Sequence, residues 1–319
     1  PVPAQAYASI LYLENQVPFG RLLRNLHRWS GYGLILTAFL HLLRVFYTGA
    51  HASPRQYNWV IGLALFGVVL LSNFTGYLLP WDQIAYWAIT ISTSMLDYVP
   101  GVGSGLKNLV LGGPEPGQAT LLNFYALHTA ILPALFVIVL PFHFWRIRKA
   151  DGLVIPRTPV EARPVEESRI AAMPHLIVRE VTTALLVLAV ALLISMFFNA
   201  PLAEQANPGL SPNPTKAPWY FMGLQELLMH FHPLMAVLVI PVLTLAAIFA
   251  IPWIDPATEQ AGVWFRSARG RRTALVAVLF ALVVTVAAIL LDEFLVKSSQ
   301  VTPATRLRNG LLPVIMGVV

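Results

Sequence analysis

Four histidines inside long apolar segments are the residues of this chain best suited to ligate a metal. His27 and His41 share one segment, and His128 and His143 share another, at intervals of 14 and 15 residues. On an α-helix, which rises about 1.5 Å per residue, these intervals cover about 21 to 23 Å, most of the depth of a bilayer's hydrocarbon core. Each segment therefore places one imidazole near each membrane face.

The direction in which these histidines point follows from the helical repeat. At about 100° per residue, the first interval falls about 40° short of four turns and the second exceeds four turns by about 60°. Both histidines of a segment therefore face roughly the same side. The two segments are separated by one crossing and run in the same direction, so we expect His27 to face His128 and His41 to face His143.

Buried ionisable residues in membrane spans are functional by default, which favours ligands over chance. Haem iron accepts two axial imidazoles from the protein, whereas small ions held by histidine also need carboxylates or thiolates, which these segments lack. The sequence therefore predicts two bis-histidine haem sites stacked across the membrane. A metal site of another kind or a proton relay is the open alternative. The remaining histidines, His51, His175, His230 and His232, we interpret as ordinary residues of the membrane interface.

The composition predicts the elements that hold these histidines. Hydrophobic residues make up 57% of the 319 residues and charged residues only 11%, against about 25% charged in soluble domains. We expect an all-α, polytopic transmembrane helix bundle with six full spans and, at Leu311–Val319, the start of another. The six spans are Trp29–Phe46, Trp59–Leu79, Leu122–Phe144, Ile177–Phe198, Leu234–Ile254 and Thr273–Leu291.

The net charge of +6 reflects membrane topology, and we expect no nucleic-acid partner. Arginines gather in residues 146–179 and 266–272, two connections that fall on the same side of the membrane as Arg44–Arg55. By the positive-inside rule this side is the cytoplasm. The absence of cysteine excludes thiolate metal sites and thioether-bound haem within this sequence.

Arginines and glycines flank the histidines at repeated intervals. Arg24 precedes His27 by three residues, and Arg44 and Arg146 follow the inner histidines by three, so each guanidinium lies beside an imidazole. They are either snorkelling arginines or partners for carboxylates of a cofactor. Gly62 and Gly76, again 14 residues apart, allow either close helix packing or a flat ligand.

Two outer connections are long enough to have structure of their own. Residues 76–105 alternate aromatic and polar residues and are predicted to form a helical hairpin at the membrane interface. Residues 206–233 are rich in proline and carry the aromatic run Trp219–Phe221. Residues 150–175 read as a cytoplasmic linker, which divides the chain into an N-terminal unit, 1–149, and a C-terminal unit, 176–319.

The chain resembles the cytochrome b family of quinol:cytochrome c and quinol:plastocyanin reductases over essentially its whole length. The likeness rests on the paired histidines, the paired glycines, GYLLPWDQ at 76–83 and PWY at 218–220, in the family's order. The 15-residue interval and LPWDQ are similar to the b6-type branch, although both halves form one chain here. The resemblance also implies a further span beyond each end of this sequence.

This resemblance implies a proton-translocating oxidoreductase subunit with two non-covalent b haems, one on His27 and His128 and the other on His41 and His143. Quinol would be oxidised at the outer side, with one electron passing to a Rieske iron–sulfur protein and the other to an inner quinone site. The implied quinol contacts are Trp81, Pro218, Trp219, Tyr220 and Phe221. Also implied are a cytochrome c-type subunit or soluble acceptor, membrane lipid, a homodimeric complex and a bacterial inner membrane.

One departure from the family pattern concerns proton transfer. The family commonly has a glutamate directly before WY, where this chain has Pro218, which can neither titrate nor donate a hydrogen bond. We expect Glu226 or Asp82 to accept the quinol proton instead, with Tyr220 as a further catalytic candidate. The alternative for each carboxylate is an ordinary interfacial position facing water.

Two other functions compete with this interpretation. A di-haem membrane anchor of a dehydrogenase or hydrogenase would explain the histidines, but it would not explain the interfacial hairpin or the proline-rich PWY segment. A transporter or assembly scaffold would use the same histidines as proton relays and would bind no haem.

Overall fold

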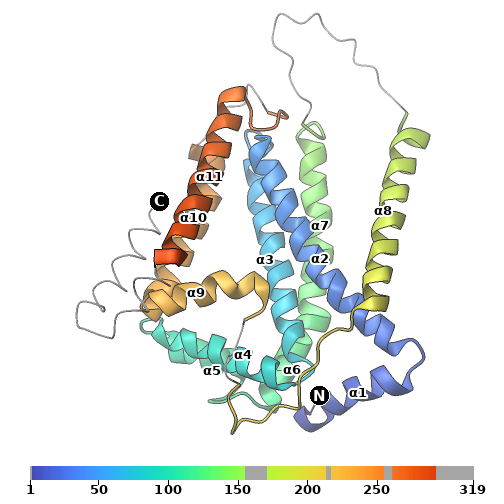
Figure 1. Cartoon of the computed structure of the whole chain (residues 1–319). Helices are drawn as coiled ribbons and strands as arrows, with labels where there is room; N and C mark the ends of the chain where they lie inside the picture. The colour runs from blue at the N-terminus through green and yellow to red at the C-terminus, as the bar shows by residue number, and fades with distance from the viewer. Residues whose placement is uncertain (1, 155–170, 213–216, 255–260, 292–319) are drawn as a thin grey trace, which may run out of the picture.

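The computed structural model describes residues 2–154, 171–212, 217–254 and 261–291, and this part of the chain is all-α (Figure 1). The seventh apolar run, 311–319, and most of the linker, 155–170, lie outside the described residues. The helices are α1 (Pro3–Gln16), α2 (Gly20–Tyr47), α3 (Gln56–Leu78), α4 (Gln83–Ser94), η1 (Met95–Tyr98), α5 (Gly103–Leu111), α6 (Gln118–Ala126), η2 (Leu127–Ile131), α7 (Leu132–Lys149), α8 (Ala172–Phe197), η3 (Trp219–Phe221), α9 (Met222–His230), η4 (Met235–Val239), α10 (Ile240–Ile254) and α11 (Ala268–Leu291).

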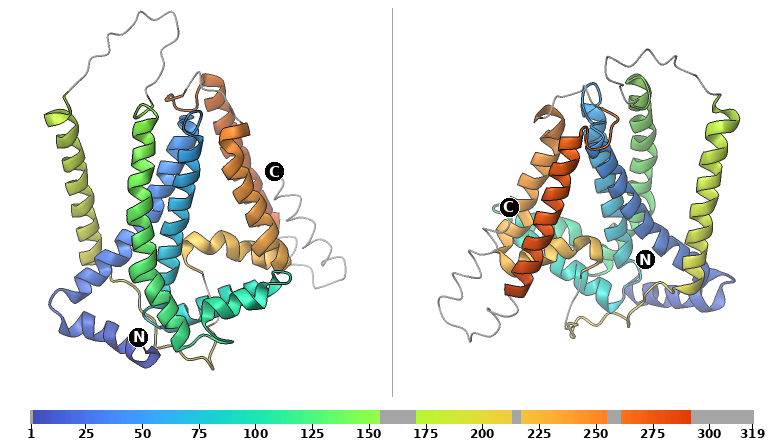
Figure 2. Two further views of the ribbon diagram at one scale, coloured as in Figure 1. Left: turned by 180° about the vertical axis from the view of Figure 1, so that it is seen from behind. Right: turned by 45° about the horizontal axis from the view of Figure 1, so that its top comes forward.

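Six helical stretches in the described residues are long and apolar enough to cross a membrane, as predicted. They are α2, α3, the continuous run α6–η2–α7, α8, η4–α10 and α11. Helix α3 packs against α2, α7 and α10, so it lies at the centre of the bundle. The short helices α1, α4, α5 and α9 lie across one end of the bundle (Figures 1 and 2).

The arginine-rich connections meet at the opposite end. The amides of Gly262 and Phe265, which precede α11, donate to the carbonyls of Thr48 and Tyr47 at the end of α2, at 2.7 and 2.9 Å. Arg55, at the start of α3, donates to the carbonyl of Ala150 after α7 at 2.6 Å. The described parts of the three connections therefore lie at one end of the bundle.

A π-helical turn, η2, interrupts the span that carries His128 and His143. Hydrogen bonding from i to i+5 gives a π turn one residue more than an α turn. The extra residue absorbs the surplus of the 15-residue interval, so both histidines face one side of the helix. Uniform α-helical geometry, which we assumed for this span from its sequence, was wrong at this turn.

The most buried apolar cluster lies beneath the predicted interfacial hairpin. Helices α4 and α5 form this hairpin, and its packed residues are Leu78, Trp81, Ala85, Tyr86, Ile89, Leu111, Leu121 and Phe124. Burying apolar side chains stabilises by about 25 cal/mol per Å² removed from water. The cluster therefore fixes the hairpin against the outer ends of α3 and α6.

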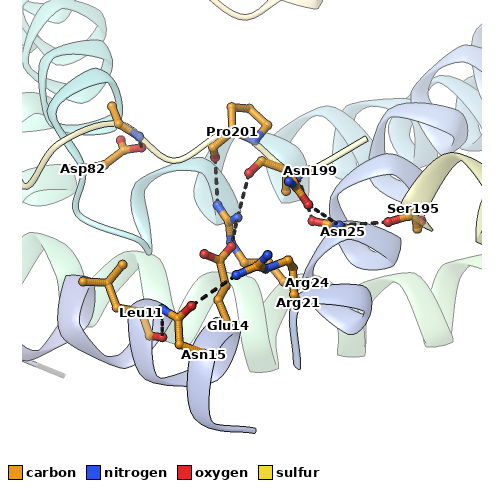
Figure 3. A network of polar contacts seen from close by, with 12 residues as sticks. Leu11, Glu14, Asn15, Arg21, Arg24, Asn25, Asp82, Ser195, Asn199 and Pro201 are labelled. Carbon is orange, nitrogen blue, oxygen red and sulfur yellow. Dashed lines mark hydrogen bonds and ion pairs between the residues drawn. The ribbon is translucent and has the colours of Figure 1, made fainter. Parts of the chain in front are cut away.

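Polar contacts join α1, α2 and the chain after α8 at the outer end (Figure 3). Asn25 is 2% exposed, donates to the Ser195 carbonyl at 2.9 Å and accepts from the Ala200 amide at 2.8 Å. Arg24 pairs with Glu14 of α1 and donates to the carbonyls of Ala200 and Pro201. This junction fixes α8 against the outer half of α2.

Candidate functional site

The outer histidine pair is brought together from α2 and η2. The ring centroids of His27 and His128 lie 5.9 Å apart, with their planes at 89°. His128 Nδ1 lies 2.9 Å from the carbonyl of Ser72, with the Thr75 hydroxyl at 3.4 Å. Because a carbonyl only accepts, this contact assigns the proton to Nδ1 and leaves the Nε2 lone pair available to a metal. Such an outer hydrogen bond is the usual orienting contact of a ligating histidine.

Gly76 of α3 is required by the position of the His128 ring. A Cβ placed on Gly76 would lie 2.5 Å from His128 Cε1 and 2.9 Å from Nδ1, closer than real Cβ contacts come. The sequence offered two explanations for this glycine, close helix packing and a flat ligand. The contact with His128 adds a third. The glycine admits the imidazole itself.

The separation of the outer pair fits two axial ligands on one metal. Metal–nitrogen bonds to imidazole are about 2 Å long, so imidazoles on opposite sides of one metal have centroids roughly 6 Å apart. The observed 5.9 Å matches this value, and it also lies within the range of direct edge-to-face contact. The separation of the two rings is therefore compatible with one metal between them.

The inner pair is arranged differently, around an open space. His41 of α2 and His143 of α7 both line a cavity of about 440 Å³, a volume typical of small-molecule and cofactor sites. Gly62 also lines it, and a Cβ there would lie 3.4 Å from His143 Cε1. His143 Nδ1 is buried without a hydrogen-bond partner. The space and the two imidazoles fit a bulky planar group.

The donor set supports haem over a simple ion. Within the described residues, no three histidine, cysteine, aspartate or glutamate side chains gather as an ordinary metal site. Two imidazoles alone are too few for a tetrahedral or octahedral ion held by protein side chains. A porphyrin supplies the other four ligands itself, so two imidazoles suffice.

The three flanking arginines do not share one role. Arg44 lines the inner cavity, together with Arg55, which we had not selected. Arg146 instead lies 5.8 Å above the ring of Tyr57. Arg24 is held in the outer junction described above (Figure 3). The geometry thus supports contact with a cofactor carboxylate best at Arg44, and the same role for Arg24 and Arg146 stays a prediction.

The PWY segment packs beside the outer histidine pair. Tyr32 of α2 makes edge contacts with Trp219 and Tyr220, each at 6.0 Å between ring centroids. Arg28 donates to the Tyr32 hydroxyl and lies over the Tyr32 and Tyr77 rings at 4.7 and 5.0 Å. We call Arg28, Tyr32, Tyr77, Trp219 and Tyr220 the outer aromatic cluster. Arg28 directly follows His27 in α2, and Tyr77 directly follows Gly76, which meets His128, so the cluster lies close to the outer pair.

The remaining predicted quinol contacts occupy different surroundings. Phe221 meets Phe74 of α3 at 5.7 Å, which extends the outer aromatic cluster along α3. Pro218 begins the 3-10 turn η3, where its carbonyl accepts from the Phe221 amide. Trp81 is only 7% exposed and lies in the core beneath α4, with a left-handed φ of 53°. Its position indicates that it holds the hairpin.

The two carboxylate candidates differ in their contacts. Asp82 is 8% exposed; one oxygen accepts from the Ala85 amide as the N-cap of α4, and the other accepts from the Ala203 amide at 3.0 Å. Protonating Asp82 would weaken both bonds. Glu226 lies on α9 and is exposed. Burial raises the pKa of the third candidate, Tyr220, so its hydroxyl stays protonated near neutral pH.

Several residues of the site were not predicted from the sequence. Arg28 and Tyr32 stand one helical turn apart just after His27, a spacing that could have marked them as a pair. Arg55 gave no signal beyond its charge. His51, which we interpreted as an ordinary residue of the membrane interface, is 2% exposed and lines the inner cavity, and its burial was not predicted.

Comparison with known proteins places this arrangement in a family. Residues 32–214 match the family model described as "Cytochrome b(N-terminal)/b6/petB". Cytochrome b6 of Synechococcus elongatus is 44% identical over 149 residues, 47% of this chain and 69% of that protein. The cytochromes b6 of Chlamydomonas reinhardtii and Porphyra purpurea are 44% and 46% identical, with the same two coverages.

A solved structure extends the likeness in fold to nearly the whole chain. A chain of a structure titled "Hyperthermophilic respiratory Complex III" superposes with a TM-score of 0.77 at 23% identity, over 99% of this chain and 81% of that one. This structural likeness shows the shared fold, and the sequence matches show the family relationship. The histidine pairs and the PWY segment thus lie in a protein that belongs to the cytochrome b/b6 family.

Proposed function

We propose that this chain is the di-haem b subunit of a proton-translocating quinol oxidoreductase complex. His27 and His128 would hold the outer b haem, and His41 and His143 the inner one. When bound, the haems supply one-electron carriers at two depths, which link an outer quinol site to an inner quinone site. This assignment of a whole complex's activity rests on the family and on the geometry of the described residues.

The observation that carries the proposal is the position of the outer aromatic cluster. Tyr32 joins the span that bears His27 to Trp219 and Tyr220 of the PWY segment, over a sequence separation of more than 180 residues. Aromatic faces suit a quinol ring, and the hydroxyls of Tyr32 and Tyr220 can donate hydrogen bonds to it. A di-haem anchor or a proton-relay transporter has no need of this cluster. Family membership also favours the proposal over both.

Proton transfer at the outer site falls to Glu226 in this proposal. Asp82 is committed to two backbone amides, and Pro218 carries no proton. Glu226 lies on α9, which directly follows η3, so it can pass a quinol proton to outer water. Tyr220 then positions the quinol hydroxyl without titrating itself.

The proposed partners are those implied by the family, and they agree with the electron balance. Quinol loses two electrons and two protons, so a Rieske iron–sulfur protein is proposed as acceptor of one electron, ahead of a cytochrome c-type subunit or soluble acceptor. We place the complex as a homodimer in the bacterial inner membrane, with the arginine-rich connections in the cytoplasm.

Glu226→Gln tests the proton role directly. The complex should be purified from membranes and its quinol oxidation followed against pH, with Glu204→Gln as the matched control, because Glu204 is also an exposed carboxylate of the outer loops. We expect Glu226→Gln to slow oxidation by roughly 10²- to 10⁴-fold and to alter the pH profile. An unchanged rate and profile would remove Glu226 from the mechanism, and purified protein unable to oxidise quinol would remove the proposed function.

A further inference from the structure

His51 is a buried histidine that the proposed function does not use. It lies in the turn between α2 and α3, with 2% of its surface exposed. Its ring stacks on Phe46 at 5.9 Å and meets Trp59 of α3 at 5.3 Å. An imidazole enclosed in this way on the cytoplasmic side is unlike the exposed His175 of α8.

Two hollows meet at His51. The first is the inner cavity of about 440 Å³, which holds His41 and His143. The second, of about 830 Å³, lies between the end of α2 and the start of α11 and is lined by Tyr47, Phe265, Arg266 and Arg269, among others. Among the described residues, His51 is the one that lines both hollows, so its imidazole forms part of the partition between them.

The described charged groups that line the two hollows come from α2, the start of α3 and the start of α11. Arg44 from α2 and Arg55 from the start of α3 line the first hollow, and Arg266 and Arg269 line the second. The described residues that line the hollows include no aspartate or glutamate. Arginine does not titrate in proteins, and His41 and His143 serve as haem ligands under the proposed function. Among the remaining described lining residues, His51 is of the type that ordinarily titrates near neutral pH.

We propose that His51 takes up a proton from the cytoplasmic side when the inner site gains an electron. The inference rests on the proposed function and deepens it. One electron arrives at the inner haem, one proton arrives from water through the second hollow, and one N–H bond forms on the imidazole. One O–H bond of the hydronium or water that donates the proton breaks, and the net charge of the site is preserved.

The physical reason is electrostatic compensation. An added negative charge in a low-dielectric interior favours the protonated form of a nearby imidazole. The coupling is reciprocal, so protonation of His51 favours reduction of the inner haem by the same free energy. The inner midpoint potential must then fall as pH rises through the range where His51 titrates.

The test is a redox titration of the purified haem-loaded complex at several values between about pH 5 and 8. A full proton per electron makes the wild-type inner midpoint fall by about 59 mV per pH unit, a tenfold change in the reduction equilibrium. We expect His51→Gln and His51→Phe to flatten this dependence while both haems stay bound. His175→Gln should keep the wild-type slope, because its side chain is exposed to water on the same side.

Each outcome decides the proposal. A wild-type inner midpoint that does not change with pH, or variants that keep the wild-type slope, would overturn it. If both variants lost the inner haem, infrared difference spectra of the wild-type protein with isotope-labelled histidine would decide, and absence of an imidazolium signal on reduction would overturn the proposal. Protein that binds no haem would instead remove the proposed function, so the two failures are distinguishable.

Discussion

The outer and inner histidine pairs have the same side chains in opposite surroundings. At the outer site the two rings lie 5.9 Å apart, and His128 is oriented by Ser72 and pressed against Gly76. At the inner site the histidines border an open cavity, and His143 Nδ1 has no hydrogen-bond partner. At the outer site, backbone contacts hold the His128 ring in a fixed orientation. At the inner site the protein provides space and positive charge.

The positive charge has a direct consequence for electron flow. Arg44 and Arg55 line the inner cavity, where they stabilise an added electron. At the outer pair, Arg24 is neutralised by Glu14. We therefore expect the inner haem to have the higher midpoint potential, so that electrons move inward.

Removing one ligand from each site is the strongest way to separate the two pairs. We expect His128→Ala to abolish the outer haem and His143→Ala the inner haem, because an iron left with one protein ligand loses its fixed position. Haem content per chain, measured from the absorbance of the purified variants, should fall from two to one in each case. Loss of both haems from either variant would show that the sites are not independent.

Alanine at the two glycines sharpens the comparison. A Cβ at Gly76 overlaps His128 at 2.5 Å, whereas one at Gly62 meets His143 at 3.4 Å. Overpacking of the first kind costs about 1–3 kcal/mol, or roughly one to two orders of magnitude in haem affinity. Gly76→Ala should therefore lose most of the outer haem, and Gly62→Ala should keep nearly all of the inner haem. Equal losses in a haem titration would contradict the contrast.

Substituting Arg44 or Arg24 should give smaller effects, and the two substitutions should change different quantities. Arg44→Gln should lower the inner midpoint potential by roughly tens of millivolts, because a charge is removed from the cavity wall. Arg24→Gln should leave both potentials nearly unchanged and instead destabilise the protein by about 1–3 kcal/mol, since it breaks charged hydrogen bonds of the outer junction. Redox titration and thermal unfolding measure the two effects. A potential shift at the outer haem in Arg24→Gln would instead place that arginine at the haem.

Much of the architecture could be predicted from local pattern. The six spans follow from runs of apolar residues, and the pairing of His27 with His128 follows from the direction of two helices separated by one crossing. The interfacial hairpin α4–α5 follows from its aromatic belt. These features depend on helical periodicity and on the length needed to cross a membrane, and both can be read from neighbouring residues in the sequence.

What could not be predicted depends on contacts between distant segments. The π turn at His128 departs from regular helical geometry, and no local residue pattern predicts it. Arg24 looks the same in sequence as Arg44, yet Glu14 and the chain after α8 engage it. His51 is buried because the connection before α11 and the start of α3 close over the α2–α3 turn. Each depends on tertiary packing, and spacing along one helix contains no information about it.

A redox titration of the purified protein, combined with a pyridine haemochrome assay, tests the two-site arrangement most directly. We predict two b haems per chain, both low-spin as expected for two imidazole ligands, with separate midpoint potentials and the higher one lost in His143→Ala. A protein with no haem, or with a single haem that survives both His128→Ala and His143→Ala, would contradict the assignment of the four histidines.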